Sequence, residues 1–313
     1  MRGTYAIVFI AMSVAFHTAS ASTAEAPAAT VNTINPMPPT ITSRYFRASD
    51  GARLHWLEAM PAAAGRHIPV IVLVPGWSMP ASIWHAQLAS LGQRYRVIAF
   101  DPRGQGQSAI PRSGYNISRR ARDLHELISR HRRVVLVGWS LGALETLQYV
   151  HLHGDARLAA LVLVDSSVGE GQATAGGGFQ AALRRDRRGT LTDFINAIFK
   201  SPRTQEDQDA LIESALRMPL AASLALFPSK VPRTRWRNTA RRFAKPLLYV
   251  VTPQFAEQAH ELASNRPATQ IEIFENAGHA LFVDEPERFN ALLAEFVADH
   301  LAQVKPQPRR RNR

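Results

Sequence analysis

The sequence predicts an α/β fold in which helices cover both faces of a mostly parallel central sheet. Short apolar runs typical of buried strands alternate with segments of helical spacing along most of the chain. This alternation indicates βαβ units and therefore a parallel sheet. It stops at Gly169 and resumes at Pro246, and the segments between have helical spacing without strands. The chain is therefore expected to carry a helical insertion inside an α/β core.

The expected elements follow in chain order. Residues 44–60 should form a hairpin, because alternating polar and apolar residues are interrupted by the turn-forming pair Asp50-Gly51. Strands are expected at 69–74, 96–100, 134–137, 158–164, 246–251 and 270–274. Residues 77–91 should form a loop and then a helix, and further helices are expected at 117–130, from about 142 to 150, and at 190–200, 206–218 and 287–300.

Length and composition describe a globular chain without cysteine chemistry. The 313 residues, 46% of them hydrophobic and 20% charged, are enough for a large core in one domain with an insertion or in two domains. The formal net charge of +12 is high. Because the chain has no cysteine, a disulfide, a thiolate metal site and a cysteine nucleophile are all excluded.

The N-terminus has the pattern of a secretory signal peptide. Arg2 supplies a positive charge, residues 6–16 are apolar, and Ala19-Ser20-Ala21 fits the small-x-small cleavage rule. We therefore expect a signal peptide at 1–21, a periplasmic or secreted protein, and no stable membrane insertion after cleavage. Residues 22–43, rich in Ala, Thr and Pro, are expected to be a disordered linker, and residues 305–313 a basic tail.

One stretch carries a specific chemical motif. Four apolar residues at 134–137 predict a buried strand, Gly138-Trp139-Ser140-Leu141-Gly142 follows at once, and an apolar helical run comes next. Strand, tight turn and helix form the context in which Gly-x-Ser-x-Gly presents a nucleophilic serine. The two glycines would keep Cβ atoms out of the space where strand and helix cross. Ser140 is therefore the candidate nucleophile.

Five stretches together resemble the α/β-hydrolase superfamily over about residues 44–304. They are VIVLVPGW at 70–77, VIAFDPRGQGQS at 97–108, VVLVGWSLG at 134–142, LVLVD at 161–165 and FENAGHALFVDEPERF at 274–289. The resemblance implies an α/β-hydrolase core at 44–168 and 244–304 with a helical cap at 169–243. PGWSMPASIW at 75–84 together with GWSLG is most similar to pimeloyl-carrier-protein methyl esterase, related small esterases and cofactor-free haloperoxidases.

The resemblance also implies a base and an oxyanion hole. His279 follows the last expected strand in an Asn-Ala-Gly-His context, and it comes after the serine in the order that this superfamily uses. The oxyanion donors should be the backbone N–H groups of Leu141 and Trp77. Members of the superfamily usually carry His-Gly before the second donor, whereas this chain has Pro75-Gly76 and lacks that side-chain donor.

The acid that would orient the histidine is the departure from the superfamily pattern. The usual Asp position after the 246–251 strand falls on or near Phe255, which cannot orient an imidazole. Three carboxylates remain as alternatives. We rank Asp165 first, because it ends the strand that follows the serine helix, then Glu257 and then Glu145.

These residues lead us to expect a cofactor-free serine hydrolase that cleaves a carboxylic ester with an apolar acyl part. The alternatives are a perhydrolase or haloperoxidase-like activity, a peptidase, or a binding protein on a degenerate hydrolase scaffold. Trp77, Trp139 and Phe179 are expected to contact the substrate. We expect no metal site and no nucleic-acid partner. Residues 169–245 hold fourteen Lys and Arg against seven Asp and Glu, which allows an acidic partner at the cap.

Overall fold

The computed structural model describes residues 39–61, 69–171 and 178–301. The expected signal peptide at 1–21, the basic tail at 305–313 and most of the linker at 22–43 lie outside these ranges. The first strand begins at Thr42, so the last two residues assigned to the linker belong to the sheet. No helix in the described ranges combines the length and apolar character needed to cross a membrane.

The described residues form an eight-stranded sheet in the order β1-β2-β4-β3-β5-β6-β7-β8. Strand β2 pairs antiparallel with both of its neighbours, and β4, β3, β5, β6, β7 and β8 pair in parallel, which confirms the mostly parallel sheet. The strands are β1 (Thr42–Arg47), β2 (Arg53–Ala59), β3 (Val70–Val74), β4 (Arg96–Asp101), β5 (Val134–Trp139), β6 (Leu158–Val164), β7 (Leu247–Val251) and β8 (Thr269–Ile273).

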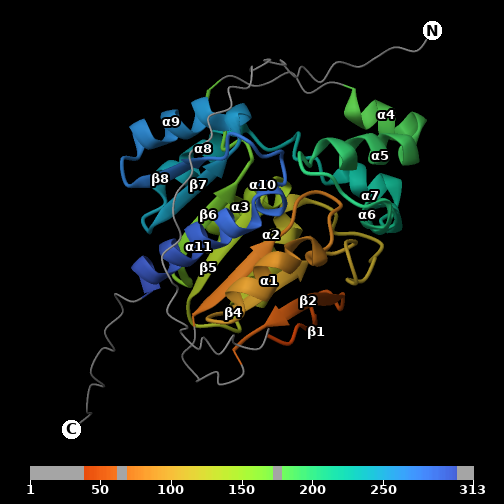
Figure 1. Ribbon diagram of the computed structural model, residues 1–313. Helices are drawn as coiled ribbons and strands as arrows, with labels where there is room; N and C mark the ends of the chain where they lie inside the picture. The colour runs from red at the N-terminus through yellow and green to blue at the C-terminus, as the bar shows by residue number, and fades with distance from the viewer. Residues whose placement is uncertain (1–38, 62–68, 172–177, 302–313) are drawn as a thin grey trace, which may run out of the picture. The chain divides into compact units, whose positions relative to one another are not determined.

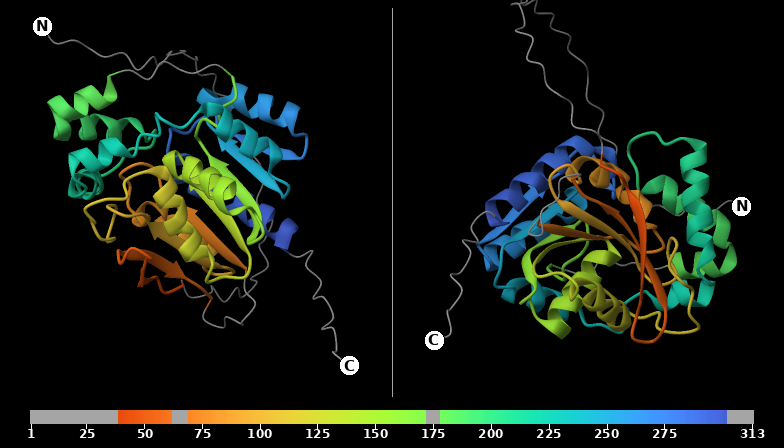
Figure 2. Two further views of the ribbon diagram at one scale, coloured as in Figure 1. Left: turned by 180° about the vertical axis from the view of Figure 1, so that it is seen from behind. Right: turned by 90° about the horizontal axis from the view of Figure 1, so that it is seen from below.

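The sheet is buried on both faces, as continuous apolar strands require. In β3, Val70, Val72 and Val74 belong to one apolar cluster, whereas Ile71 and Leu73 belong to a second. Helices α1 (His85–Leu91) and α11 (Pro286–Leu301) cover one face. Helices α2 (Ile117–Ile128), α3 (Leu141–His153), α8 (Arg233–Arg242) and α9 (Ala256–Asn265) cover the other, as Figures 1 and 2 show. This arrangement confirms the expected layers.

In the described residues between β6 and β7, five helices follow one another without an intervening strand. They are α4 (Phe179–Arg185), α5 (Arg187–Ala197), α6 (Gln205–Arg217), α7 (Leu220–Ala225) and α8. Helices α4 to α7 gather at one side of the core, whereas α8 packs beside α3 and α9 (Figure 1). Sequence periodicity indicated only α5 and α6. Helices α4 and α7 are too short to show periodicity, and arginine-rich α8 buries little besides Trp236 and Ala240.

The remaining helical segments are short and flank loops at the carboxyl ends of the strands. They are η1 (Ala81–Trp84) after β3, η2 (Pro253–Phe255) after β7, and α10 (Leu281–Asp284) after β8. In open α/β sheets, functional side chains gather at this edge, where the parallel strands end.

Candidate active site

Three polar side chains from separate loops meet at the carboxyl ends of the parallel strands. Ser140 follows β5, Asp165 follows β6, and His279 lies in the loop after β8. Nε2 of His279 lies 2.9 Å from Oγ of Ser140, and Nδ1 lies 2.7 Å from Oδ2 of Asp165. In such an array the imidazole can take the hydroxyl proton while the carboxylate holds the ring orientation.

The backbone at this edge adopts conformations that L-residues rarely take. In the described part of the chain, the non-glycine residues with positive φ are Ser78 (61°), Ser140 (55°) and Asp165 (40°). All three lie in loops that follow β3, β5 and β6. Such strain costs on the order of 1–3 kcal/mol per residue and is typical of functional sites. The sharp turn at Ser140 projects its hydroxyl away from the strand and towards His279.

The two glycines of the motif allow this turn to pack closely. A Cβ atom on Gly138 would lie 2.5 Å from the carbonyl oxygen of Gly142, and a Cβ atom on Gly142 would lie 2.5 Å from that of Val74. Real Cβ atoms do not approach a carbonyl so closely. Strand β5, helix α3 and the end of β3 can therefore meet behind Ser140 only because both positions lack side chains.

Asp165 is held by a residue that the sequence did not single out. Its side chain is fully buried, and Oδ1 accepts hydrogen bonds from the backbone N–H and the hydroxyl of Thr252, at 2.7 and 2.8 Å. The hydroxyl of Tyr249 donates to the carbonyl of Ser166 at 2.6 Å. Burial, together with the charges of Asp165 and Glu170, raises the pKa of Tyr249 well above its usual range, so this hydroxyl stays a donor. Strand β7 therefore anchors the loop that carries the carboxylate.

The other two carboxylates lie elsewhere. Glu145 is buried on α3 and pairs with Arg120 at 2.7 Å, and Glu257 is exposed in the first turn of α9. Phe255, at the position where the acid was first expected, lines a cavity beside His279. The structure therefore brings Asp165, and neither glutamate, into contact with the histidine.

Two hydrogen bonds, one to a residue of β5 and one to a residue of α10, fix the loop that carries His279. The indole N–H of Trp139 donates to the carbonyl of His279 at 2.8 Å, and Asp284 accepts from the N–H of Gly278 at 2.7 Å. Trp139 is only 1% exposed and does not line the cavity. The expectation that Trp139 contacts substrate is therefore corrected: as the last residue of β5 it points into the core, where it supports the histidine loop.

The two expected oxyanion donors lie beside the serine. Leu141 begins α3 directly after Ser140, and Trp77 lies in the loop after β3. A Cβ atom on Gly76 would lie 3.1 Å from Cβ of Ser140, so this loop contacts the serine turn. Within the described residues, the backbone N–H of neither Trp77 nor Leu141 donates to another protein group. Both remain available to a negatively charged oxygen.

A cavity of about 330 Å³ opens above these groups and is walled mainly by aromatic and aliphatic side chains. The indole N–H of Trp77 donates to the carbonyl of Ser223 in α7 at 2.8 Å, which fixes the ring in the wall. Phe179, Phe194 and Phe227 pack around it at ring-centroid distances of 5.3–5.8 Å. The lining residues are Trp77, Ser140, Leu141, Leu144, Asp165, Ser166, Ser167, Phe179, Phe194, Leu226, Phe227, Pro228, Phe255 and His279.

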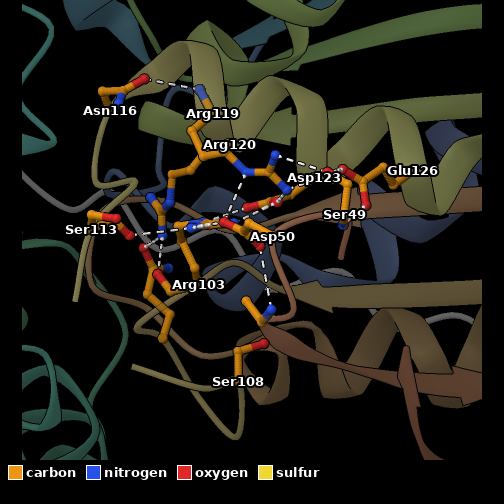
Figure 3. Close-up of polar contacts among 12 residues, drawn as sticks. Ser49, Asp50, Arg103, Ser108, Ser113, Asn116, Arg119, Arg120, Asp123 and Glu126 are labelled. Atoms are coloured by element: carbon orange, nitrogen blue, oxygen red, sulfur yellow. Dashed lines mark hydrogen bonds and ion pairs between the residues drawn. The ribbon is translucent and has the colours of Figure 1, made fainter. Parts of the chain in front are cut away.

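A buried charge cluster underlies the loop after β4 (Figure 3). The guanidinium of Arg103 is fully buried, binds both carboxylate oxygens of Asp123 at 2.6 and 2.8 Å, and reaches Asp50 at 2.9 Å. Burial alone would raise the pKa of Asp50, but the hydrogen bond and charge of Arg103 lower it overall. Arg119 also contacts Asp123, at 2.6 Å. These contacts tie the β4–α2 loop to α2 and to the β1–β2 turn.

A second Ser–His–Asp array lies near the sheet edge, outside the cavity. Nδ1 of His55 lies 2.7 Å from Oδ2 of Asp101, and Nε2 lies 3.1 Å from Oγ of Ser43. The same Asp101 carboxylate accepts the backbone N–H groups of Ala81 and Gln107. Since none of these three residues lines the cavity at Ser140 and the carboxylate of Asp101 braces loops, we assign the array to structure.

Some of the basic side chains of residues 169–245 bind groups within the same segment. Arg241 binds both carboxylate oxygens of Glu170, and Arg233 donates to the carbonyl of the same residue. Arg235 and Arg242 instead line an open groove of about 540 Å³ between α3 and α8. Among the described residues, no group of three or more His, Asp or Glu is placed to hold a metal ion.

Comparisons with known proteins show the family and the fold of this chain. A family model of the alpha/beta hydrolase family matches residues 71–292. A pimeloyl-[acyl-carrier protein] methyl ester esterase from Vibrio cholerae is 27% identical over 72% of this chain and 93% of its own length. A Synechocystis protein assigned as a non-heme chloroperoxidase is 28% identical over 72% of this chain and 90% of its own. The crystal structure of a Burkholderia cenocepacia protein assigned as an aryl esterase superposes with a TM-score of 0.74 at 25% identity, over 84% of this chain and all of that one.

Proposed function

The chain belongs to the alpha/beta hydrolase family, and on that premise we propose that it is a serine hydrolase that cleaves carboxylic esters through an acyl-enzyme on Ser140. The observation that carries this proposal is the position of His279, which contacts Ser140 with one ring nitrogen and Asp165 with the other at the floor of an apolar cavity. The three proteins compared above are assigned as two esterases and one chloroperoxidase, which supports esterase-like or haloperoxidase-like activity.

In the first half-reaction, Oγ of Ser140 attacks the ester carbonyl carbon while Nε2 of His279 takes the hydroxyl proton. The carbonyl oxygen becomes an oxyanion and accepts hydrogen bonds from the N–H groups of Trp77 and Leu141. The tetrahedral intermediate collapses, the bond to the leaving alkoxide breaks, and His279 returns the proton to that oxygen. Asp165 keeps the imidazole in the required tautomer and stabilises the imidazolium.

In the second half-reaction, water replaces the alcohol. His279 takes a proton from the water, whose oxygen attacks the acyl carbon. The intermediate collapses with cleavage of the bond to Oγ, and His279 gives the proton back to Ser140. The products are a carboxylic acid and the free enzyme.

The cavity supports an apolar and compact acyl group. Its walls are aromatic and aliphatic, and no Lys or Arg is among its lining residues. A volume of about 330 Å³ is at the lower end of the range usual for small-molecule sites. Phe255 and the aromatic group around Trp77 offer ring faces and edges to an acyl chain or an aryl ring.

Perhydrolysis is the second candidate function, and the relative assigned as a chloroperoxidase favours it. In this reaction hydrogen peroxide, rather than water, attacks the same acyl-enzyme and yields a peracid. The same three side chains would serve, because His279 would deprotonate the peroxide as it deprotonates water.

Labelling with a fluorophosphonate probe tests the proposal. We expect one adduct, on Ser140, that blocks hydrolysis of p-nitrophenyl esters, and we expect Ser140→Ala to abolish both labelling and turnover. Ser43→Ala is the matched control, because Ser43 also contacts a His–Asp pair and should affect neither readout. Failure of the folded wild-type protein to react with the probe, or to hydrolyse any p-nitrophenyl ester in a series of increasing acyl-chain length, would contradict a serine hydrolase. Adding hydrogen peroxide and measuring peracid separates the two candidates.

A further inference from the structure

The loop that carries the Trp77 N–H needs support that its own sequence does not supply. Pro75 has no side-chain donor, and Ser78 adopts a positive φ of 61°. The backbone bond from the N–H of Met79 to the carbonyl of Gly76 is long, at 3.3 Å. An oxyanion donor is effective only where it is fixed in advance of the reaction. Another part of the chain must therefore hold this loop.

Gln105, in the loop between β4 and α2, makes that contact. Its side chain is 1% exposed, and Nε2 donates to the carbonyl of Gly76 at 3.0 Å and to the carbonyl of Met79 at 2.7 Å. The two acceptors flank Trp77 in the chain, and both donor hydrogens of the amide are used. The amide therefore fixes the loop segment on both sides of the oxyanion donor.

Arg120 sets which way the amide of Gln105 points. A guanidinium can only donate, and it contacts Oε1 of Gln105, so the NH₂ group must face the two carbonyls. Arg120 is itself buried on α2 and pairs with Glu145 of α3 at 2.7 Å. Burial lowers the pKa of Arg120 and raises that of Glu145, so each needs the other to stay charged.

We propose that Gln105 is a positioning residue for the oxyanion hole, with Arg120 and Glu145 as its support. Through two hydrogen bonds it holds the Trp77 N–H at the place where negative charge develops. This inference rests on the proposed function, since it assigns Gln105 to the step in which Ser140 attacks a carbonyl.

Gln105→Glu is the most direct test of these hydrogen bonds. It keeps the shape of the side chain and the oxygen that accepts from Arg120, but it removes both hydrogens donated to the loop. We expect kcat to fall about 10- to 100-fold with KM within about twofold of the wild-type value, which is less than the loss of a whole oxyanion donor. Affinity for a trifluoromethyl ketone, which forms a tetrahedral adduct on the serine, should fall in parallel. Affinity for the matching methyl ketone, which binds as a ground-state analogue, should stay the same.

Gln148→Glu is the matched control, because Gln148 is also a buried glutamine whose Nε2 donates one bond, to Ser118, away from the loop. It should lower the thermal midpoint without changing kcat or the ratio of the two ketone affinities. If Gln105→Glu is poorly folded, Gln105→Met removes the same donors with an apolar side chain. Loss of folding in both variants would contradict the proposal, because it would assign Gln105 to stability.

A Gln105→Glu enzyme that loses thermal stability but keeps kcat and the ketone ratio would also overturn the inference, and would leave the proposed function intact. By contrast, a wild-type protein that neither turns over esters nor reacts at Ser140 would refute the proposed function itself.

Discussion

Oδ2 of Asp165 lies 2.7 Å from Nδ1 of His279, although 114 residues separate the two in the chain. Sheet order produces this contact, because β6 lies between β5 and β7 and places its end beside the serine turn. The other carboxylate oxygen of Asp165 is held by Thr252 at the end of β7, so the acid is oriented before substrate binds.

The first prediction concerns this acid. Asp165→Asn should lower kcat by about 10³- to 10⁴-fold, because an amide cannot hold the imidazole in the tautomer that accepts the serine proton. Steady-state ester hydrolysis measures the effect, and circular dichroism checks the fold. Glu257→Gln is the control, and it should leave kcat unchanged because Glu257 is exposed on α9. A strong loss in Glu257→Gln with little loss in Asp165→Asn would reverse the assignment.

The second prediction concerns acyl-chain length. Phe255 lines the cavity beside His279, so Phe255→Ala should enlarge the acyl site. We expect the optimum of kcat/KM over a series of p-nitrophenyl esters to shift to chains about two to four carbons longer, since each buried methylene contributes about 0.8 kcal/mol. Phe255→Trp should shift it to shorter chains. An unchanged optimum in both variants would show that Phe255 does not border the acyl group.

The third prediction is a pH dependence of stability. Burial, assisted by the charge of Arg96, lowers the pKa of His131 from 6.5 to about 4. Between these values the unfolded chain binds a proton that the folded chain does not, so stability falls as the pH drops from 6.5 towards 4. After allowance for solvent screening, we expect this histidine to account for about 1–2 kcal/mol.

Urea midpoints at pH 7 and pH 4.5 measure this dependence. His131→Gln should reduce the difference between the two midpoints, whereas His85→Gln, at an exposed position, should leave it unchanged. The assignment fails if His131→Gln retains the full wild-type difference.

The fourth prediction concerns export. Ala19-Ser20-Ala21 fits the cleavage rule for secretory signal peptides, so the exported protein should begin near Ser22. N-terminal sequencing of protein from the periplasm or the medium measures this directly. Exported protein that still begins at Met1 would be inconsistent with cleavage at this site.

The sequence by itself determined the parts of this protein that depend on short-range patterns. Apolar runs marked the strands, and Gly138-Trp139-Ser140-Leu141-Gly142 indicated a strand, turn and helix, because the two glycines meet local steric needs within a few residues. The same patterns missed α8, because its many arginines obscure the apolar periodicity of its two buried residues. They also placed Trp139 in the substrate site, although its side chain points into the core.

Only the tertiary structure decided which carboxylate meets His279 and what braces the Trp77 loop. The sequence offers three carboxylates, Asp165, Glu257 and Glu145, and allows them only to be ranked. Which of them contacts the histidine depends on strand order and on the direction of each side chain. The contacts of Gln105 depend in the same way on how the β4–α2 loop folds against the end of β3. Hydrogen bonds act over about 3 Å, so contacts between residues far apart in the chain exist only after the sheet has assembled.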